Sequence, residues 1–214
     1  MQYRFFCSCG IMSKESKGVD VMNKIILASN SPRRKQLMEM LGFDFSVIVS
    51  QVDEKIDPSL NEEELVMDLA YQKAVDIFRT HKDDIVLGFD TLVYAEGETL
   101  GKPKDTADAE RMLGLLSGKT HLLVTGCAII TKKMSKSFYV ASEVTFYPMT
   151  KEEIADYIAT KEPFDKAGAY AVQGLGSKFI KSIHGDYFTV MGLPVSRLYH
   201  ELKAMDLLEN ETRQ

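Results

Sequence analysis

The sequence lacks the features that mark several classes of protein, beginning with cysteine. It has three cysteines and no tryptophan in 214 residues. Cys7, Cys9 and Cys127 supply neither a disulfide framework nor the paired C-x-x-C spacing of a zinc site. Such sparing use of thiols is typical of proteins from a reducing compartment, so we expect a cytoplasmic location.

Long apolar runs are absent as well. No stretch approaches the roughly 18 consecutive apolar residues of a transmembrane helix, so we expect no membrane partner. The first 22 residues contain only short apolar pieces and do not resemble a signal peptide. We interpret residues 1–22 as a disordered or dispensable extension and residues 23–207 as a single domain.

Positive charge is not in excess either. The net charge is −5, so the chain has no overall basic footprint and we expect no stable nucleic-acid partner. The sequence also contains no G-x-x-x-x-G-K-[ST] phosphate loop, no G-x-S-x-G serine motif and no zinc-like spacing among its four histidines. A site for a polyanion must therefore be local and built in another way.

What is present is an alternation of strand-like and helical patterns. Strands and helices alternate early in the chain, and later two strand-like segments are joined by a short polar turn typical of a hairpin. This order predicts an α/β fold with a mixed, twisted sheet and flanking helices. The predicted strands are 24–29, 45–50, 84–94, 121–131 and 137–147, with short strands near 169–174 and 178–185. The predicted helices are 32–41, 61–80, 107–116, one that begins after a T-x-x-E capping box at 150, and 194–206.

The segment SNSPRR is the first sign of a site. Ser31 is a candidate N-cap and Pro32 the first residue of a helix, so Arg33 and Arg34 fall in the first helical turn. Arginines there oppose the helix dipole by roughly 0.3–1 kcal/mol each. A bound phosphate reverses that effect because it accepts hydrogen bonds from the helix amides and from both guanidinium groups. The alternative is a solvated basic turn.

Two charged residues stand where apolar ones are expected. Lys73 falls in the apolar stripe of the helix predicted over 61–80, where a buried lysine without a partner is costly. It either extends to the rim of the core or points into a polar cavity that holds a carboxylate or a phosphate. Asp90 interrupts the apolar strand IVLGFDTLVY. It is either a local acceptor at a turn or bulge, or a carboxylate at a cleft that acts as general base or metal ligand.

Three further residues are weaker candidates. Lys102 lies in a Gly-Lys-Pro turn, and Asp53 and Glu54 follow the second predicted strand. Taken alone, each of these residues is equally typical of a solvent-exposed surface. One group of cations and one of carboxylates together indicate a phosphate ester that is handled with a divalent metal, Mg²⁺ or Mn²⁺.

A series of motifs along the chain resembles the Maf family of nucleoside triphosphate pyrophosphatases. The matching segments are, in order, ILASNSPRRKQLMEMLG, AYQKA, GFDTLV, GKP, HLLVTG, DKAGAYAVQG and GDYFTVMGLP. They extend from about Lys24 to Lys203, nearly the whole chain. Because this family is similar in fold to the inosine triphosphatase-like enzymes, the resemblance implies a mixed sheet around a central cleft, a single catalytic domain and a homodimer.

The resemblance also implies a reaction and the residues that carry it. The reaction is the metal-dependent hydrolysis of a nucleoside triphosphate to the monophosphate and pyrophosphate. DKAGAYAVQG resembles the branch that acts on dTTP and UTP, with CTP and modified pyrimidine nucleotides left open. Asp90 matches the catalytic proton acceptor and Glu54 a metal-linked carboxylate, and Asp90 acts either as the base or as a second metal ligand beside Glu54. The implied substrate-binding residues are Ser29, Ser31, Arg33, Arg34, Lys73, Thr91, Lys102, Asp165, Lys166 and Gln173.

Three of these residues, Arg33, Thr91 and Gln173, match positions tied to substrate choice. The amide of Gln173 can donate to O4 and accept from N3–H of thymine or uracil. One departure is Phe89, which stands where the family usually has a small residue, so we expect altered packing near the site.

Two other functions fit the same residues. One is a nucleotide-binding regulator of cell division and septum formation whose catalysis is incidental. The other is a monophosphatase that releases inorganic phosphate.

Overall fold

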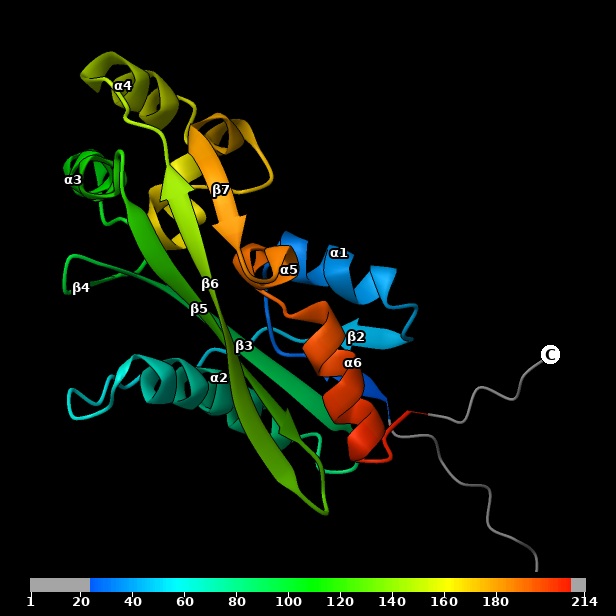
Figure 1. Cartoon of the computed structure of the whole chain (residues 1–214). Coiled ribbons are helices and arrows are strands. Elements are labelled where there is room, and N and C mark those ends of the chain that lie inside the picture. The colour runs from blue at the N-terminus through cyan, green and yellow to red at the C-terminus, as the bar shows by residue number, and fades with distance from the viewer. Residues whose placement is uncertain (1–23, 209–214) are drawn as a thin grey trace, which may run out of the picture.

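The structure is a computed structural model that describes residues 24–208, whose strands form one seven-stranded sheet (Figure 1). The strand order is β2-β1-β3-β5-β6-β7, and β4 pairs with β3 off this path. β1 is parallel to β2 and β3, whereas the other pairs are antiparallel. The predicted α/β fold with a mixed sheet is confirmed, and the predicted extension over 1–22 lies outside the described residues.

Most of the predicted elements are present with slightly different ends. The strands are β1 (Ile25–Leu27), β2 (Phe45–Val47), β3 (Ile85–Ala95), β4 (Glu98–Leu100), β5 (Thr120–Ile130), β6 (Ser135–Phe146) and β7 (Ile180–His184). The α-helices are α1 (Pro32–Met40), α2 (Glu62–Phe78), α3 (Thr106–Leu116), α4 (Lys151–Ala159), α5 (Tyr187–Met191) and α6 (Val195–Ala204). Three short 3₁₀ helices are η1 (Glu162–Asp165), η2 (Ala167–Ala169) and η3 (Leu175–Phe179). Within the described residues no helix is long and apolar enough to cross a membrane.

Several segments differ from the sequence prediction, among them the short helix α5, which no predicted helix covers. The strand expected near 169–174 is wrong: Gly168 and Ala169 have positive φ angles of 68° and 61°, which turn the chain away from extended geometry. In the region expected to be only a turn, Glu98–Leu100 forms β4. A tight turn at Glu96 and Gly97, both at positive φ, returns this strand onto Val93–Ala95 of β3.

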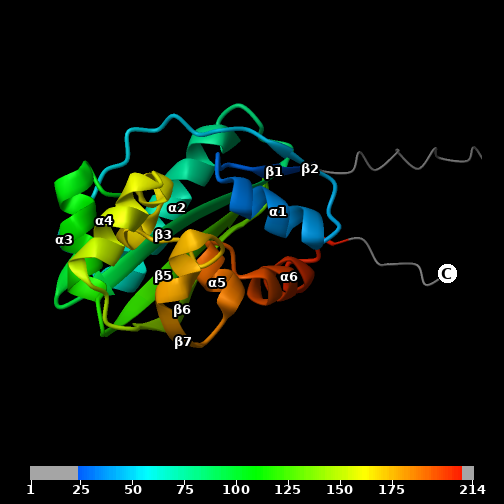
Figure 2. The ribbon, with the colours of Figure 1, turned by 90° about the horizontal axis from the view of Figure 1, so that it is seen from above.

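Helix α2 packs unusually close to the sheet because two glycines face it. A side-chain carbon on Gly88 of β3 would clash with the carbonyl of Ala70, and one on Gly126 of β5 would clash with the carbonyl of Val66. Figure 2 shows α2 on one side of the sheet and α5 and α6 on the other. The close approach brings the α2 side chains directly over the middle of β3.

The edge of β3 away from β5 is open in its middle. β1 pairs with Ile85–Leu87 and β4 pairs with Val93–Ala95, while β5 runs along the opposite edge. Residues 88–92 therefore have no strand beside them on this edge within the described part of the chain. Side chains of β3 alternate between the two faces. Those of odd number, such as Phe89, join the core under α1 and α6, and those of even number, such as Leu92, face α2.

Candidate active site

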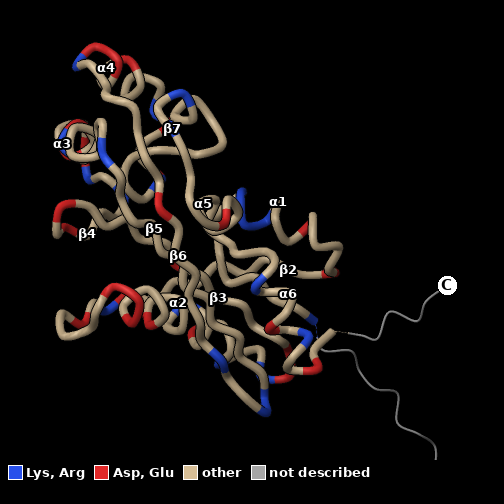
Figure 3. Tube along the Cα trace, in the orientation of Figure 1, with Lys and Arg blue, Asp and Glu red and all other residues tan. Residues whose placement is uncertain are grey.

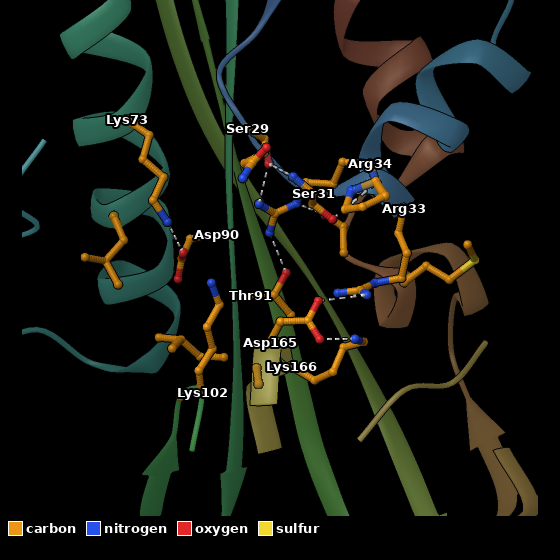
Figure 4. Close-up of a pocket in the computed structure, with 18 of the residues that line it drawn as sticks. Ser29, Ser31, Arg33, Arg34, Lys73, Asp90, Thr91, Lys102, Asp165 and Lys166 are labelled. Atoms are coloured by element: carbon orange, nitrogen blue, oxygen red, sulfur yellow. Dashed lines mark hydrogen bonds and ion pairs between the residues drawn. The ribbon is translucent and has the colours of Figure 1, made fainter. Parts of the chain in front are cut away.

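A cavity of about 570 Å³ opens at this gap in the sheet. Its walls come from the start of α1, the loop after β2, α2, the middle of β3, the turn after β4, the segment around η2, and α5 (Figure 4). Every predicted site residue except Gln173 lines it, so segments from one end of the chain to the other meet here.

Lys73 and the carboxylates of Glu54 and Asp90 form the charged centre of the α2 side. The Lys73 ammonium contacts the Asp90 carboxylate and lies 3.1 Å from the Glu54 carboxylate. The Lys73 and Asp90 side chains are only 17% and 12% exposed. Of the two alternatives for Lys73, the structure shows the polar cavity rather than the rim, because its ammonium is paired with the buried carboxylate of Asp90.

Asp90 sits in the middle of a regular strand, not at a turn or bulge. It lies opposite Gly126 in the β3–β5 ladder. A carboxylate can occupy this position because the open edge of β3 gives it access to the cleft and because Lys73 compensates its charge. Thr91 points to the other face of the sheet and also reaches the cleft through the same gap.

Arg34 is largely occupied by the protein itself. Its guanidinium donates to the Gly192 carbonyl at 2.8 Å and, at 3.1 Å each, to the Ser29 hydroxyl, the Phe89 carbonyl and the Thr91 hydroxyl. Burial lowers its pKa below the ordinary value of an arginine. The guanidinium also lies over the Phe89 ring, 5.8 Å from its centroid, so the unusual Phe89 packs against this arginine.

The hydroxyl of Thr91 has a fixed direction of hydrogen bonding. Thr125 donates its single hydroxyl proton to the Thr189 carbonyl at 2.9 Å. The 2.9 Å contact between the Thr91 and Thr125 hydroxyls must then be donated by Thr91, which in turn accepts from Arg34. Thr91 therefore has only a lone pair left for a ligand, and it can contact one only as an acceptor.

The start of α1 presents cations instead of the usual acids. Figure 3 shows basic residues at the start of α1 and acidic residues at the start of α2. Ser31 caps α1 by accepting from the Arg34 amide at 3.4 Å, as predicted. The neighbouring Ser29 is buried and accepts from the Ser31 amide at 3.3 Å. Because the Arg34 guanidinium is already bonded to protein acceptors, Arg33 is the arginine at this helix start that is more available to bind an anion.

Arg33 approaches a second ion pair across the cleft. Its guanidinium lies 3.8 Å from the Asp165 carboxylate, which also contacts the Lys166 ammonium. Burial raises the pKa of Asp165, but the hydrogen bond from Lys166 and the charges of Lys166 and Arg33 outweigh it and hold the pKa below its ordinary value. Lys102 lines the cleft nearby and forms no ion pair with the described residues.

Charge in the cleft is positive overall. Five cations line it, Arg33, Arg34, Lys73, Lys102 and Lys166, against three carboxylates, Glu54, Asp90 and Asp165. The surplus favours a polyanionic ligand.

Glu54 and Asp90 have the chemistry of a magnesium site that is completed by a ligand. Nowhere in residues 24–208 do three His, Cys, Asp or Glu side chains gather as a metal cluster. The two carboxylates instead converge on one cation, the Lys73 ammonium. Mg²⁺ is commonly bound by one or two carboxylates together with phosphate oxygens of a substrate. The donor set therefore fits a divalent cation that binds with a phosphate ligand.

Gln173 is the predicted residue that the structure does not bring into the cleft. Its side chain is exposed, and it is not among the lining residues. The neighbouring residues Ala171 and Val172 do line the cleft, with Tyr170, Val190 and Met191. Sequence analysis missed this apolar wall, although its members lie within the quoted motifs AYAVQG and TVMG, because buried apolar residues look like ordinary core.

Known proteins resemble this chain over most of its length. Residues 24–205 match the family model described as Maf-like protein. A dTTP/UTP pyrophosphatase from Bacillus cytotoxicus is 52% identical over 185 residues, 86% of this chain and 97% of the relative. One from Bacillus cereus is 53% identical over 186 residues, 87% and 97% of the two chains.

Among solved structures, the Ham1 protein of Staphylococcus aureus is 16% identical and has a TM-score of 0.49, covering 86% of this chain and all of that chain. The family itself follows from the sequence matches, which run through every segment that builds the cleft. On this evidence, the chain belongs to the Maf family.

Proposed function

We propose that this protein is a nucleoside triphosphate pyrophosphatase that hydrolyses dTTP and UTP to the monophosphate and pyrophosphate. The observation that carries the proposal is the buried carboxylate of Asp90, which is paired with Lys73 and opens onto a cleft with surplus positive charge. Relatives more than half identical to this chain carry the name dTTP/UTP pyrophosphatase, which supports the substrate.

The charged half of the cleft would bind the triphosphate. Arg33, Lys102 and Lys166 would contact its oxygens and offset the charge that grows on the departing pyrophosphate. Asp90 would accept a proton from a water molecule as that water attacks the α-phosphorus. The bond between the α-phosphorus and the bridging oxygen then breaks, and pyrophosphate leaves with that oxygen.

A metal ion would bind at the two carboxylates on the α2 side of the cleft. Glu54 and Asp90 would hold Mg²⁺ or Mn²⁺, which when bound neutralises phosphate charge and polarises the ligand. Lys73 lies between the two carboxylates and keeps both oriented toward the cleft.

The apolar half of the cleft would take the base. Tyr170, Ala171, Val172, Val190 and Met191 offer a surface of the kind that a pyrimidine ring contacts. Thr91 can only accept a hydrogen bond, and N3–H of thymine or uracil is a donor, whereas N3 of cytosine is not. Thr91 alone does not separate these bases from cytosine, whose N4 amino group is also a donor, so the support for dTTP and UTP comes from the relatives that carry those names.

The setting of the enzyme is part of the proposal. The resemblance to the family supports a homodimer, and the sparing use of cysteine supports a cytoplasmic location. A nucleotide is the expected partner of the monomer and of the dimer. Size-exclusion chromatography with light scattering at several protein concentrations measures the first point.

A product assay on a panel of nucleoside triphosphates tests the proposed function. Each nucleotide is incubated with Mg²⁺, with and without added inorganic pyrophosphatase. Monophosphate and pyrophosphate from dTTP and UTP, with GTP unchanged, is the expected result. Free phosphate without the coupling enzyme would indicate a monophosphatase, and nucleotide binding without turnover would indicate a regulator.

A further inference from the structure

Glu162 lies outside the cleft, but its carboxylate ties down the segment that forms the apolar wall. One carboxylate oxygen accepts from the Leu175 amide at 3.0 Å. The other accepts from the Gly176 amide at 3.0 Å and from the Tyr157 hydroxyl at 2.7 Å. Two backbone amides at the start of η3 and one phenol thus depend on a single acidic side chain.

Tyr157 extends this network to the wall itself. Its hydroxyl oxygen accepts from the Ala171 amide at 3.1 Å, while its proton goes to Glu162. Tyr157 is 1% exposed, so its hydroxyl and the Ala171 amide bonded to it have no solvent to replace a lost partner. The residues on either side of Ala171, Tyr170 and Val172, line the cleft as Ala171 does.

Two glycines are present because Glu162 and Tyr157 come so close to the backbone. A side-chain carbon on Gly174 would clash with the Glu162 carboxylate. One on Gly176 would lie 2.5 Å from the Tyr157 hydroxyl and 2.9 Å from the Ala171 carbonyl. The segment VQGLG is therefore shaped around these two side chains, not merely adjacent to them.

The charge of Glu162 suits this arrangement. Burial raises the pKa of Glu162, but the hydrogen bonds from Tyr157, Leu175 and Gly176 outweigh it and hold the pKa below its ordinary value. A carboxylate that accepts several hydrogen bonds is stabilised in its ionised form. At neutral pH the network therefore has a fixed direction, with Glu162 accepting from every partner.

We propose that Glu162 is a positioning residue that fixes residues 170–176 against the base side of the cleft and so sets selectivity for the pyrimidine base. The proposal rests on the proposed function, because it assigns the base to this wall. The Glu162 carboxylate forms no hydrogen bond with a side chain that lines the cleft; it acts through Tyr157, Ala171 and the start of η3. Lys166, which does line the cleft, donates to the backbone carbonyl of Glu162 at 3.2 Å, a group that a side-chain substitution keeps.

The substitution Glu162→Gln tests this role with little change in size. An amide has one oxygen and one NH₂ group, and the two carboxylate oxygens each face a backbone N–H. Whichever way the amide turns, its NH₂ group meets the N–H of Leu175 or of Gly176. One donor is left without a partner, and the segment loses an anchor.

Steady-state kinetics distinguish an effect on the apolar wall from an effect on the phosphate-binding half of the cleft. For Glu162→Gln we expect KM for dTTP to rise about tenfold and the preference for dTTP over GTP to fall about tenfold, as for one lost hydrogen bond to a charged group, with kcat changed less than twofold. Inhibition by inorganic pyrophosphate, which has no base, should be unchanged. Tyr157→Phe, which removes the partner of the Ala171 amide, should shift KM in the same direction.

The matched control is Glu153→Gln on the same helix as Tyr157, α4. Glu153 accepts from the Thr150 amide at 2.8 Å in the α4 capping box and forms no hydrogen bond or ion pair with residues 170–176 of the described chain. It should lower stability slightly through the cap and leave KM, selectivity and pyrophosphate inhibition as in the wild type.

Hydrogen exchange gives a readout that needs no substrate. The amides of Ala171, Leu175 and Gly176 should exchange at least about tenfold faster in Glu162→Gln, while amides of β5 keep their rates. Unchanged exchange at these amides overturns the proposal. So does a variant with wild-type KM and selectivity, or one in which pyrophosphate inhibition weakens as much as dTTP binding. Absence of dTTP and UTP turnover in the wild type, by contrast, counts against the proposed function, and the exchange rates then decide whether Glu162 holds the segment.

Discussion

One buried histidine, His121 on β5, should make the fold sensitive to mild acid. Its side chain is 3% exposed and packs edge-to-face against Phe146 and Tyr170, with ring centroids 5.1 and 5.4 Å away. Nε2 lies 2.9 Å from the Tyr170 hydroxyl, and Nδ1 is buried without a hydrogen-bond partner among the described residues. Burial lowers its pKa from 6.5 to about 4.

The sign of the effect follows from where the proton binds. Between pH 6.5 and 4 the unfolded chain takes up a proton at this histidine and the folded chain does not. The stability is therefore complete above pH 6.5 and declines as the pH falls toward 4. At about 1.4 kcal/mol per unit of pKa, the loss between pH 7 and pH 5 is about 2 kcal/mol, a sizeable part of a typical 5–15 kcal/mol.

Urea denaturation at pH 7, 6 and 5 measures this loss. The comparison is His121→Phe, which keeps an aromatic ring against Phe146 but cannot take up a proton. Carboxylates with lowered pKa values, Glu162 and Asp165 among them, stabilise the fold above their unfolded pKa and lose that contribution only in more acidic solution. The variant should thus show a loss smaller by about 2 kcal/mol over this range. Equal pH dependence in both proteins would refute the reasoning.

Three substitutions probe the cleft and the segment beside it. Asp90→Asn should lower kcat by about 10²–10⁴ as expected for loss of a general base, with nucleotide affinity in calorimetry without a divalent metal nearly unchanged; wild-type turnover would exclude the assigned role. Arg34→Lys cannot reproduce a fork that meets Ser29, Thr91 and two carbonyls, so we expect a loss of about 2–4 kcal/mol in urea denaturation; unchanged stability with weaker pyrophosphate binding would make Arg34 a phosphate ligand instead. Gln173 is exposed and does not line the cleft, so Gln173→Ala should leave base selectivity and turnover near the wild-type values; a relaxed preference across the nucleotide panel would assign Gln173 to base recognition, as the family resemblance implies.

The sequence was informative where a side chain conflicts with its own local pattern. Lys73 interrupts an apolar helical stripe and Asp90 an apolar strand, and the structure places the two in contact. A conflict of this kind can be found without knowing the fold, because a charge in a buried position needs a partner. The mixed sheet and the hairpin of β5 and β6 were predictable for a similar reason, since their patterns are long and regular.

Residues whose orientation depends on distant backbone were not predictable. Arg34 turns inward because carbonyls of Phe89 and Gly192, far away in sequence, face it. Gln173 turns outward because the chain after Gly168 follows an irregular path and not the alternation of a strand. Glu162 had no local signal at all, because a surface-like acid near a proline looks the same whether or not it accepts from a remote segment.

The open edge of β3 has a consequence for how this enzyme can change. Asp90 and Thr91 are neighbours in the chain, but their side chains lie on opposite faces of the sheet. Lys73 of α2 contacts Asp90 on one face, and Arg34 and Thr125 hydrogen-bond Thr91 on the other. On the proposed function, we expect substitutions in α2 to change mainly the rate of reaction and substitutions on the opposite face to change mainly the choice of nucleotide. Because the supports of Asp90 and Thr91 lie on separate faces, the same fold can change its substrate without a change in its reaction.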